Sequence, residues 1–446
     1  MDLTRPPQTP ALPVYKLPPV LETKLDNGLA VLLIQDHRFP MVTARLGFQA
    51  GSKYDPPSLP GLSESTATLL SEGAWNRTAR QIAEEVNDIG GSISASSSAD
   101  LLVLGGNALS EYLAKLIDLM ADVARNASFP EDEVELHKQN RTQELLSQRS
   151  DASFLADEKF GELLFAPHPY SRQDPTLESI AALDHLALAG FRDRCLAPNN
   201  AVLVLLGALP PPQEALDMVR AEFGSWQARE APAPPPAEFP EPQRAIVLVN
   251  RPGSVQADIR IGRLGVPRHH PDYFPLLVGN SILGGGTSSR LFMNIRERQG
   301  FAYDVHSAAQ PLKDSGTFTV VTQVRNEVLA EALQALLAEM RQIGSHPVSA
   351  DELEATANYL SGVFVIRLET QDGLAAQVAA VRLMGLPLAY LENYTTRVRA
   401  VTREEIRAAA ARYVDPERAA VVVVGDASKI AAQLESIGKV TVEEAK

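Results

Sequence analysis

The hydrophobic residues of the chain follow the same order twice. Each half opens with two segments rich in aliphatic residues, within residues 28–48 in the first half and residues 245–263 in the second. Each half closes with a short apolar run, at residues 197–209 and residues 414–428. Short apolar runs bounded by turn residues are typical of buried strands. The pattern predicts that two similar units build the molecule.

The spacing between corresponding segments is nearly constant. Pro198 and Gly207 correspond to Pro416 and Gly425, and both pairs are 218 residues apart. Upstream, the segment EDEVEL recurs as ADELEA with an offset of 219 residues. Matching segments in the same order at a nearly constant offset indicate an internal duplication.

The period of the apolar residues predicts how each half folds. In the first half, a strand at residues 99–105 precedes a helix at residues 110–125. In the second half, residues 316–324 form the strand, and Asn326 is expected to cap the following helix. Consecutive strands joined by short turns predict antiparallel pairing, and the bunched helices predict one helical layer. The expected class is α+β: two homologous repeats, each a mostly antiparallel sheet with helices packed on one face.

Proline-rich segments give the expected borders of the repeats. The first 19 residues are rich in proline, and APAPPPAEFPEP contains six prolines between residues 231 and 242. Such a segment is typical of an extended, semi-rigid linker. The predicted division is a tail at 1–19, a repeat at 20–228, a linker at 229–243 and a repeat at 244–446.

Composition excludes several classes of protein. The 446 residues carry 41 Lys and Arg against 55 Asp and Glu, a net charge of −14, which argues against a nucleic-acid partner. No run of about 18 apolar residues is present, so no transmembrane segment is expected. Cys195 is the only cysteine, which excludes a disulfide within the chain.

The start of the sequence does not resemble a signal peptide. The compartment is expected to be the periplasm if a signal peptide has been removed, and otherwise the cytoplasm.

The segment AGSKYDPPSLPGLSESTATLLSEGA, residues 50–74, resembles a region of the insulinase/pitrilysin-type zinc peptidases, which include the mitochondrial processing peptidases. Active members carry H-x-x-E-H there, with two His ligands on one helical face and a Glu that polarises the bound water. Alignment on the Gly61-Leu62 pair gives the three corresponding positions here. They are Glu64, Ala67 and Thr68.

The remaining ligand position of the family corresponds to Glu144. Two carboxylates alone are not the nitrogen- and sulfur-rich set that tetrahedral zinc prefers, so no metal is expected in this chain. Glu144 is expected to form an ion pair on a helix. The opposing interpretation is an independent enzyme with an unusual metal site built on Glu64 and Glu144.

A second segment, ILGGGTSSRLFMNIRERQGFAYDVHS at residues 282–307, resembles the signature of the same family in its second half. Gly284, Gly285 and Gly286 are expected to form a turn, at the place where the processing-peptidase α-subunit has its glycine-rich substrate loop. Ser288 or Ser289 is expected to cap a short helix that ends before Gly300.

Arg296 and Tyr303 lie seven residues apart in this segment. Taken alone, an Arg in an RER run is typical of solvated charge and a Tyr on a strand is typical of the core. The resemblance implies another role, because in active members an Arg and a Tyr at these places reach the zinc site in the other half. The Arg holds the substrate backbone, and the Tyr donates a hydrogen bond to the developing oxyanion.

The resemblance implies a function for this combination of residues. We expect a non-catalytic subunit of a heterodimeric zinc metallopeptidase, with Arg296 and Tyr303 acting in trans and zinc bound by a homologous partner. The substrate is expected to be an extended peptide that pairs with an edge strand near residues 90–100. The alternative is a structural subunit with a peptidase-like fold, like the core proteins of the respiratory cytochrome complex, and no role in catalysis.

Overall fold

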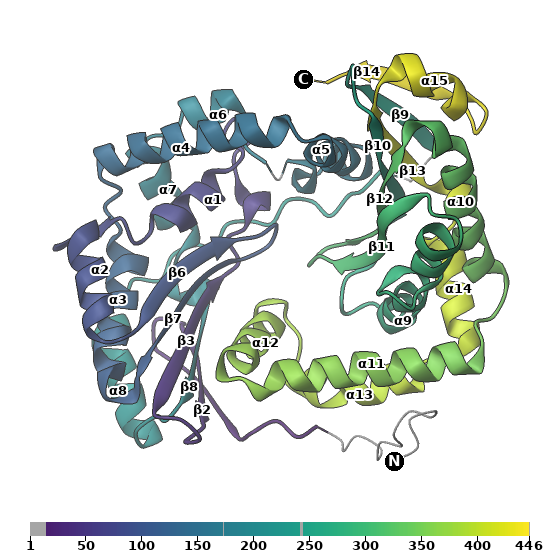
Figure 1. The fold of residues 1–446 in the computed structure, drawn as a ribbon. Coiled ribbons are helices and arrows are strands. Elements are labelled where there is room, and N and C mark those ends of the chain that lie inside the picture. Colours follow the sequence, from purple (N-terminus) through teal and green to yellow (C-terminus); the bar gives the residue numbers. More distant parts are fainter. Residues whose placement is uncertain (1–14, 173, 241–243, 446) are drawn as a thin grey trace.

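A computed structural model describes residues 15–172, 174–240 and 244–445 of the protein. It contains two six-stranded sheets that lie on opposite sides of the molecule (Figure 1). In the first sheet the strands follow the order β1-β2-β8-β3-β7-β6. Their bounds are β1 (Val20–Lys24), β2 (Ala30–Gln35), β3 (Met41–Phe48), β6 (Ser92–Ser97), β7 (Leu102–Leu109) and β8 (Ala201–Gly207).

The second sheet repeats this arrangement in the order β11-β12-β10-β13-β9-β14. The bounds are β9 (Ala245–Asn250), β10 (Gln256–Leu264), β11 (Ala302–Pro311), β12 (Gly316–Arg325), β13 (Ala420–Gly425) and β14 (Val440–Glu444). In reverse, this order matches the first sheet strand for strand, and β14 takes the place of β1. The expected α+β class and the duplicated, mostly antiparallel sheets are therefore confirmed.

The expected pairing of the opening strands in each half is wrong. β8 lies between β2 and β3, parallel to β2 and antiparallel to β3. β13 lies in the same way between β9 and β10. The reason is burial, because side chains on both faces of β8 and β13 are shielded from water, and a strand of this kind needs a central position.

The helices of the first half surround one end and one face of the first sheet. They are α1 (Leu62–Leu69), α2 (Ala79–Asp88), α3 (Leu113–Asn126), α4 (Glu131–Arg149), α5 (Ala152–Phe165), α6 (Leu177–Ala181), α7 (His185–Cys195) and α8 (Pro212–Phe223). A small hairpin, β4 (Gly73–Ala74) with β5 (Arg77–Thr78), precedes α2. The strand expected at residues 99–105 begins three residues later, at Leu102.

The second half has a corresponding helical layer. Its helices are α9 (Tyr273–Gly284), α10 (Leu329–Ser345), α11 (Ala350–Glu369), α12 (Gln371–Leu383), α13 (Ala389–Ala400), α14 (Arg403–Tyr413) and α15 (Ala427–Glu435). Asn326 was expected to cap α10, but it does not. It lies in a short 3-10 turn before the helix, and its buried amide donates to the carbonyl of Ser254 at 2.8 Å instead.

One helix from each half packs on the sheet of the other half. α5 lies on the second sheet, where Leu155 and Phe160 belong to the same buried cluster as Val247 and Val422. α12 lies on the first sheet, against β3 and β8 (Figure 1). The inner face of each sheet is therefore covered in part by its counterpart's helix, a feature that the expected one-sided helical layer did not include.

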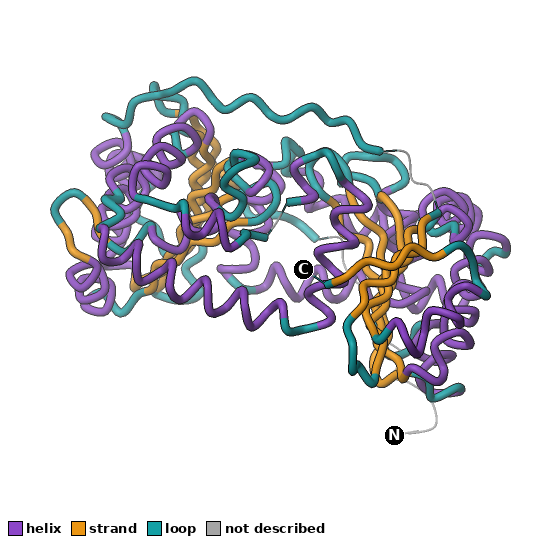
Figure 2. The backbone as a smooth tube through the Cα atoms, turned by 90° about the horizontal axis from the view of Figure 1, so that it is seen from above, coloured by secondary structure: helices purple, strands orange, loops and turns teal. Residues whose placement is uncertain are grey.

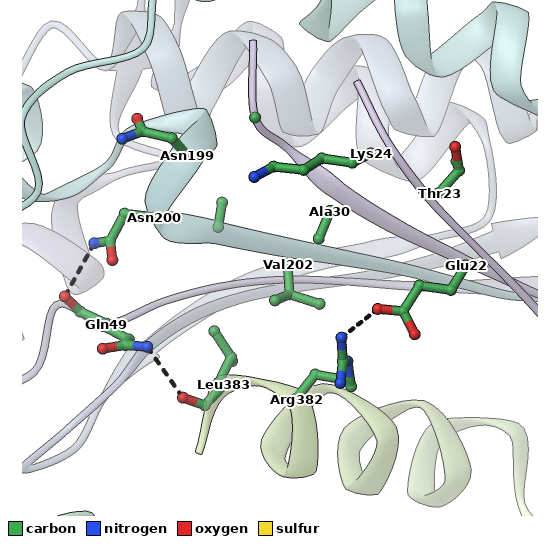
Figure 3. Close-up of a pocket in the computed structure, with 12 residues that line it drawn as sticks. Glu22, Thr23, Lys24, Ala30, Gln49, Asn199, Asn200, Val202, Arg382 and Leu383 are labelled. Atoms are coloured by element: carbon green, nitrogen blue, oxygen red, sulfur yellow. Dashed lines mark hydrogen bonds and ion pairs between the residues drawn. The ribbon is translucent and has the colours of Figure 1, made fainter. Parts of the chain in front are cut away.

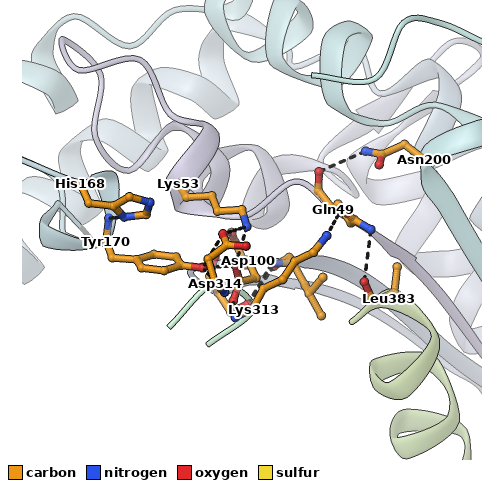
Figure 4. Close-up of polar contacts among 12 residues, drawn as sticks. Gln49, Lys53, Asp100, His168, Tyr170, Asn200, Lys313, Asp314 and Leu383 are labelled. Atoms are coloured by element: carbon orange, nitrogen blue, oxygen red, sulfur yellow. Dashed lines mark hydrogen bonds and ion pairs between the residues drawn. The ribbon is translucent and has the colours of Figure 1, made fainter. Parts of the chain in front are cut away.

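A buried polar cluster also joins the halves (Figure 4). The Nζ of Lys53 lies 2.8 Å from carboxylate oxygens of both Asp100 and Asp314. The hydroxyl of Tyr170 donates to Asp100 at 2.6 Å, and the backbone N–H of Lys313 donates to the same carboxylate at 2.8 Å. The turn between β11 and β12 is thereby fixed to the first half.

The proline-rich linker connects the halves along the outside of the molecule (Figure 2). Its described part, up to residue 240, has no helix or strand. Phe239 nevertheless packs against His168, with ring centroids 4.6 Å apart. The remaining linker residues, 241–243, and most of the predicted tail lie outside the described residues. Among the helices in the described part of the chain, none is long and apolar enough to span a bilayer.

Candidate functional site

The helix that corresponds to the zinc motif, α1, has a strongly fixed start. Gly61 precedes it with a φ of 88°, a conformation that favours glycine. The carboxylate of Asp55 accepts hydrogen bonds from the N–H groups of Gly61 and Ser63, both at 2.9 Å. Burial raises the pKa of Asp55 to about 7, although these N–H donors favour its charged form. The first turn of α1 is thus held by a carboxyl group instead of solvent.

The three motif positions on α1 differ in environment. The Ala67 side chain is buried in the core of the first half. Thr68 is exposed, and its hydroxyl donates to the carbonyl of Glu64 at 3.1 Å. Glu64 alone of the three carries a group that could bind a metal, and its partner is a cation of the protein.

That cation is Arg141 of α4, which is only 6% exposed to solvent. One Nη of Arg141 lies 3.4 Å from the carboxylate of Glu64, and the other Nη lies 3.4 Å from the carboxylate of Glu144. Arg141 also donates to the side-chain oxygen of Gln148 at 3.0 Å. The guanidinium therefore bridges the two carboxylates at the degenerate metal positions, and the expected ion pair of Glu144 is present.

These residues do not fit a zinc ion. A fixed positive charge bridges Glu64 and Glu144, and the other two motif positions supply a methyl group and an exposed hydroxyl. Among the described residues, no group of three or more His, Cys, Asp or Glu side chains could hold a metal ion.

A histidine lies one turn before Arg141 on α4. The Nε2 of His137 lies 3.0 Å from the hydroxyl of Ser65 on α1. Burial lowers the pKa of His137, and the charge of Arg141 lowers it further. The result is a neutral imidazole that connects α4 to α1.

The glycines of the second segment lie at the end of α9. Gly284 is the last residue of the helix and Gly285 follows it. A Cβ on Gly284 would collide with the backbone nitrogen and hydroxyl of Ser307 on β11, so close packing of α9 against β11 requires this glycine. Gly286 is exposed and faces open space. A role of the three glycines in substrate binding stays a prediction.

The short helix expected after these glycines is present, but most of it is a π-helical segment, Phe292–Arg298. The hydroxyl of Ser289 accepts a hydrogen bond from the N–H of Phe292 at 3.4 Å, as expected for a cap. At the other end, Gln299 donates to the carbonyl of Asn294, five residues earlier, at 3.1 Å. π-helical turns are rare in proteins, and where they occur they often lie at functional sites.

Arg296 and Tyr303 are in contact. The guanidinium carbon of Arg296 lies 4.9 Å from the centroid of the Tyr303 ring and 4.6 Å from that of Phe292. Tyr303 lies near the start of β11, within the irregular stretch between Ala302 and Val305 where the pairing with β12 shifts register, and is 85% exposed. The only ion pair of Arg296 among the described residues is with its neighbour Glu297, at 3.5 Å. Tyr303 is therefore largely exposed and Arg296 partly exposed, and both side chains carry hydrogen-bond donors.

Two cavities lie between the halves. The larger, of about 890 Å³, runs along α5 and is lined by α5, α6, β11 and β12. The smaller, of about 530 Å³, lies between the first sheet and the end of α12 (Figure 3). In the smaller cavity Arg382 pairs with Glu22, and Gln49 donates to the carbonyl of Leu383 at 3.2 Å. The pair of Arg382 with Glu22 and the hydrogen bond of Gln49 thus contribute to the contact between α12 and the first sheet.

The sequence pattern did not indicate a role for Arg141 or for Phe292. Arg141 lies three residues before Glu144, a spacing that permits an ion pair on a helix, but its contact with α1 spans 77 residues. Phe292 and Arg296 are four residues apart, and the spacing alone does not indicate a stacked pair.

Comparisons with known proteins identify the family that the chain resembles. Residues 30–166 match the family described as Insulinase (Peptidase family M16), and residues 182–360 match the family described as Peptidase M16 inactive domain. An uncharacterized zinc protease of Mycobacterium leprae is 26% identical over 416 residues, which covers 92% of this chain and 93% of that protein. The uncharacterized zinc protease YmxG of Bacillus subtilis is 25% identical over 78% of this chain and 84% of its own length.

Solved structures with the same fold support the comparison. A crystal structure described as a peptidase M16 inactive domain from Pseudomonas fluorescens superposes with a TM-score of 0.86 at 25% identity, covering 92% of this chain and 98% of that chain. A protease from Helicobacter pylori has a TM-score of 0.81 at 19% identity and covers 92% of this chain and 100% of its own, which shows the fold alone.

Proposed function

Because the chain belongs to the insulinase (M16) family of peptidases, we propose that it is the non-catalytic subunit of a heterodimeric zinc metallopeptidase. In this proposal Arg296 and Tyr303 act in trans at the active site of a homologous, zinc-bearing partner. The observation that carries the proposal is the contrast between the two motif regions. Arg141 bridges the carboxylates at Glu64 and Glu144, whereas Arg296 and Tyr303 contact each other, with Tyr303 largely exposed and Arg296 partly exposed.

The chemistry assigned to the pair follows from its functional groups. A guanidinium has several N–H donors in one plane and can hold the carbonyl groups of a substrate backbone. The Tyr303 hydroxyl can donate to the oxyanion that forms when the peptide carbonyl is attacked. Attack on the peptide carbonyl requires a water molecule that is activated in the partner chain, since Glu64 and Glu144 of this chain do not fit zinc.

The first sheet offers a place for an extended peptide. β6 is the last strand of that sheet, and among the described residues β7 is the one strand that pairs with it, so its other edge is not part of a ladder. A peptide that adds to such an edge is held through its backbone and accepts many side chains. This supports an extended peptide as the substrate.

The test is reconstitution with a homologue that has an intact H-x-x-E-H motif. Cleavage of an unstructured peptide should require both chains. Tyr303→Phe should lower kcat about 100-fold or more, as loss of an oxyanion donor does. Arg296→Ala should lower kcat/KM by about 10-fold to 100-fold, because the substrate is less well held.

Matched variants separate this effect from general damage. Arg298→Ala removes a neighbouring exposed Arg, and Tyr359→Phe removes the hydroxyl of an exposed Tyr on α11; neither should change the rate. Full activity of the zinc-bearing chain alone, unaffected by Arg296→Ala or Tyr303→Phe, would reject the proposal. A complex that needs this chain for assembly but tolerates both substitutions would identify it as a structural subunit.

A further inference from the structure

The π-helical segment places an aromatic ring against the proposed substrate-binding Arg. We infer that Phe292 is a positioning residue, which holds the guanidinium of Arg296 in a fixed plane between its own ring and that of Tyr303. The inference rests on the proposed function and extends it to a residue that does not itself contact the substrate.

The distances are those of cation–π contacts. The guanidinium carbon of Arg296 lies 4.6 Å from the centroid of Phe292 and 4.9 Å from that of Tyr303, both within the range of a cation–π contact. In a stacked arrangement the rings contact the guanidinium through its π-system, while its N–H donors lie in its plane at its edge. Stacking therefore orders the side chain and leaves donors available for carbonyl oxygens.

The ring of Phe292 is itself held by a fixed backbone. Ile295 is fully buried in the core of the second half. The side-chain amide of Asn294 donates to Glu339 of α10 at 2.7 Å. Just before the segment, Arg290 forms two hydrogen bonds with Glu352 of α11, at 2.7 and 2.9 Å. These contacts lie on both sides of Phe292, so the ring position follows from the packing of α10 and α11.

A fixed ring matters because a free Arg side chain is flexible. An exposed Arg loses several rotatable bonds when it grips a ligand, and ordering it beforehand lowers that cost. Tyr303 is mostly exposed and makes only one face of the stack, so the partly buried Phe292 supplies the fixed reference. The inference predicts that the π-system at position 292 is what matters, more than its volume.

The experiment uses the reconstituted heterodimer and five variants of this chain, one of them a double variant. Phe292→Leu, which keeps an apolar side chain but removes the ring, should lower kcat/KM about 10-fold. Phe292→Tyr, which keeps the ring, should stay within about twofold of wild type. Met293→Ala, on an exposed neighbour in the same segment, is the control and should change nothing. In the Arg296→Ala background, Phe292→Leu should cause no further loss, which a merely structural role would not predict.

A second measurement needs no partner. The side-chain Nε–H resonance of Arg296, identified by its absence in Arg296→Lys, should shift in Phe292→Leu and stay near its position in Phe292→Tyr. An unchanged resonance in Phe292→Leu would overturn the inference, whatever the peptidase assay shows. So would a loss of activity in Phe292→Leu that persists unchanged in the Arg296→Ala background.

The two proposals can fail separately. If Arg296→Ala lowers kcat/KM and Phe292→Leu does not, the positioning role is wrong and the proposed function stands. If Arg296→Ala has no effect on cleavage, the proposed function is wrong, and with it the catalytic part of the inference; the resonance of Arg296 still decides whether Phe292 orders the side chain.

Discussion

At the scale of single residues, two of the positions that correspond to the zinc ligands, Glu64 and Glu144, form an ionic cluster with Arg141. Arg141 bridges carboxylates that would otherwise repel one another, and it connects α4 to α1. The sequence predicted that Glu144 forms an ion pair, but the identity of its partner depended on the packing of two helices. Arg296 and Tyr303 could be singled out because their motif is local; Arg141 could not, because its contact with Glu64 is long-range.

Replacement of Arg141 by Met tests this role. Met keeps part of the apolar stem but leaves Glu64 and Glu144 without their shared cation. Both carboxylates are about half exposed, so solvent screens the lost ion pairs, and we expect the free energy of unfolding to fall by only about 1–2 kcal/mol. The measurement is the urea midpoint. Arg80→Met, which removes a largely exposed pair with Glu84, is the control and should change the midpoint far less; equal effects would contradict the role of Arg141.

At the scale of elements, local signals identified the strands that open and close each half and a few helices, but not which strands pair with one another. The β-rich pairs at the start of each half are strands, yet each pair is separated by a strand from about 170 residues further along. The turn that joins β11 to β12 is a similar case. No local pattern in the sequence links this turn to the other half, yet Asp314 lies against the buried Lys53 there.

The buried cluster predicts that Lys53 holds this turn. Lys53 has no exposed side-chain surface and Asp100 is 3% exposed, so Lys53→Met leaves a buried carboxylate without its cation. Removal of one partner from a buried pair costs about 3–5 kcal/mol, and we expect the free energy of unfolding, measured by urea titration, to fall by this amount. Lys138→Met, which removes a surface pair with Glu135, should have little effect.

A double variant identifies the cause. Asp100→Asn in the Lys53→Met background removes the unpaired charge while it keeps a side chain that can hydrogen-bond to Tyr170. We expect part of the lost stability to return. If the single and double variants unfold at the same denaturant concentration, the cluster acts through packing and not through charge.

At the scale of the whole molecule, the sequence repeats are not independent packing units. The duplication and its proline linker were predictable, because both leave local patterns. The exchange of α5 and α12 between the sheets was not, because an apolar helical face does not specify which sheet it covers. The cluster of Leu155, Phe160, Val247 and Val422, and that of Leu32, Val204, Leu374 and Val378, each unite the two halves.

The last prediction concerns these shared clusters. Residues 1–228 and residues 244–446, expressed separately, should each expose an apolar helix face and an apolar sheet face. Each buried aliphatic or aromatic side chain contributes about 1.5–3 kcal/mol, so loss of several contacts exceeds the stability of a typical domain. Separate halves should bind an apolar dye and lack a cooperative transition, whereas co-expression should yield a 1:1 complex. A full-length chain with a protease site inserted near residue 230 of the linker should stay associated after cleavage, because the shared clusters hold the halves together without the covalent link. Two soluble, cooperatively folding monomers would show instead that the exchanged helices are accessories to halves that are stable alone.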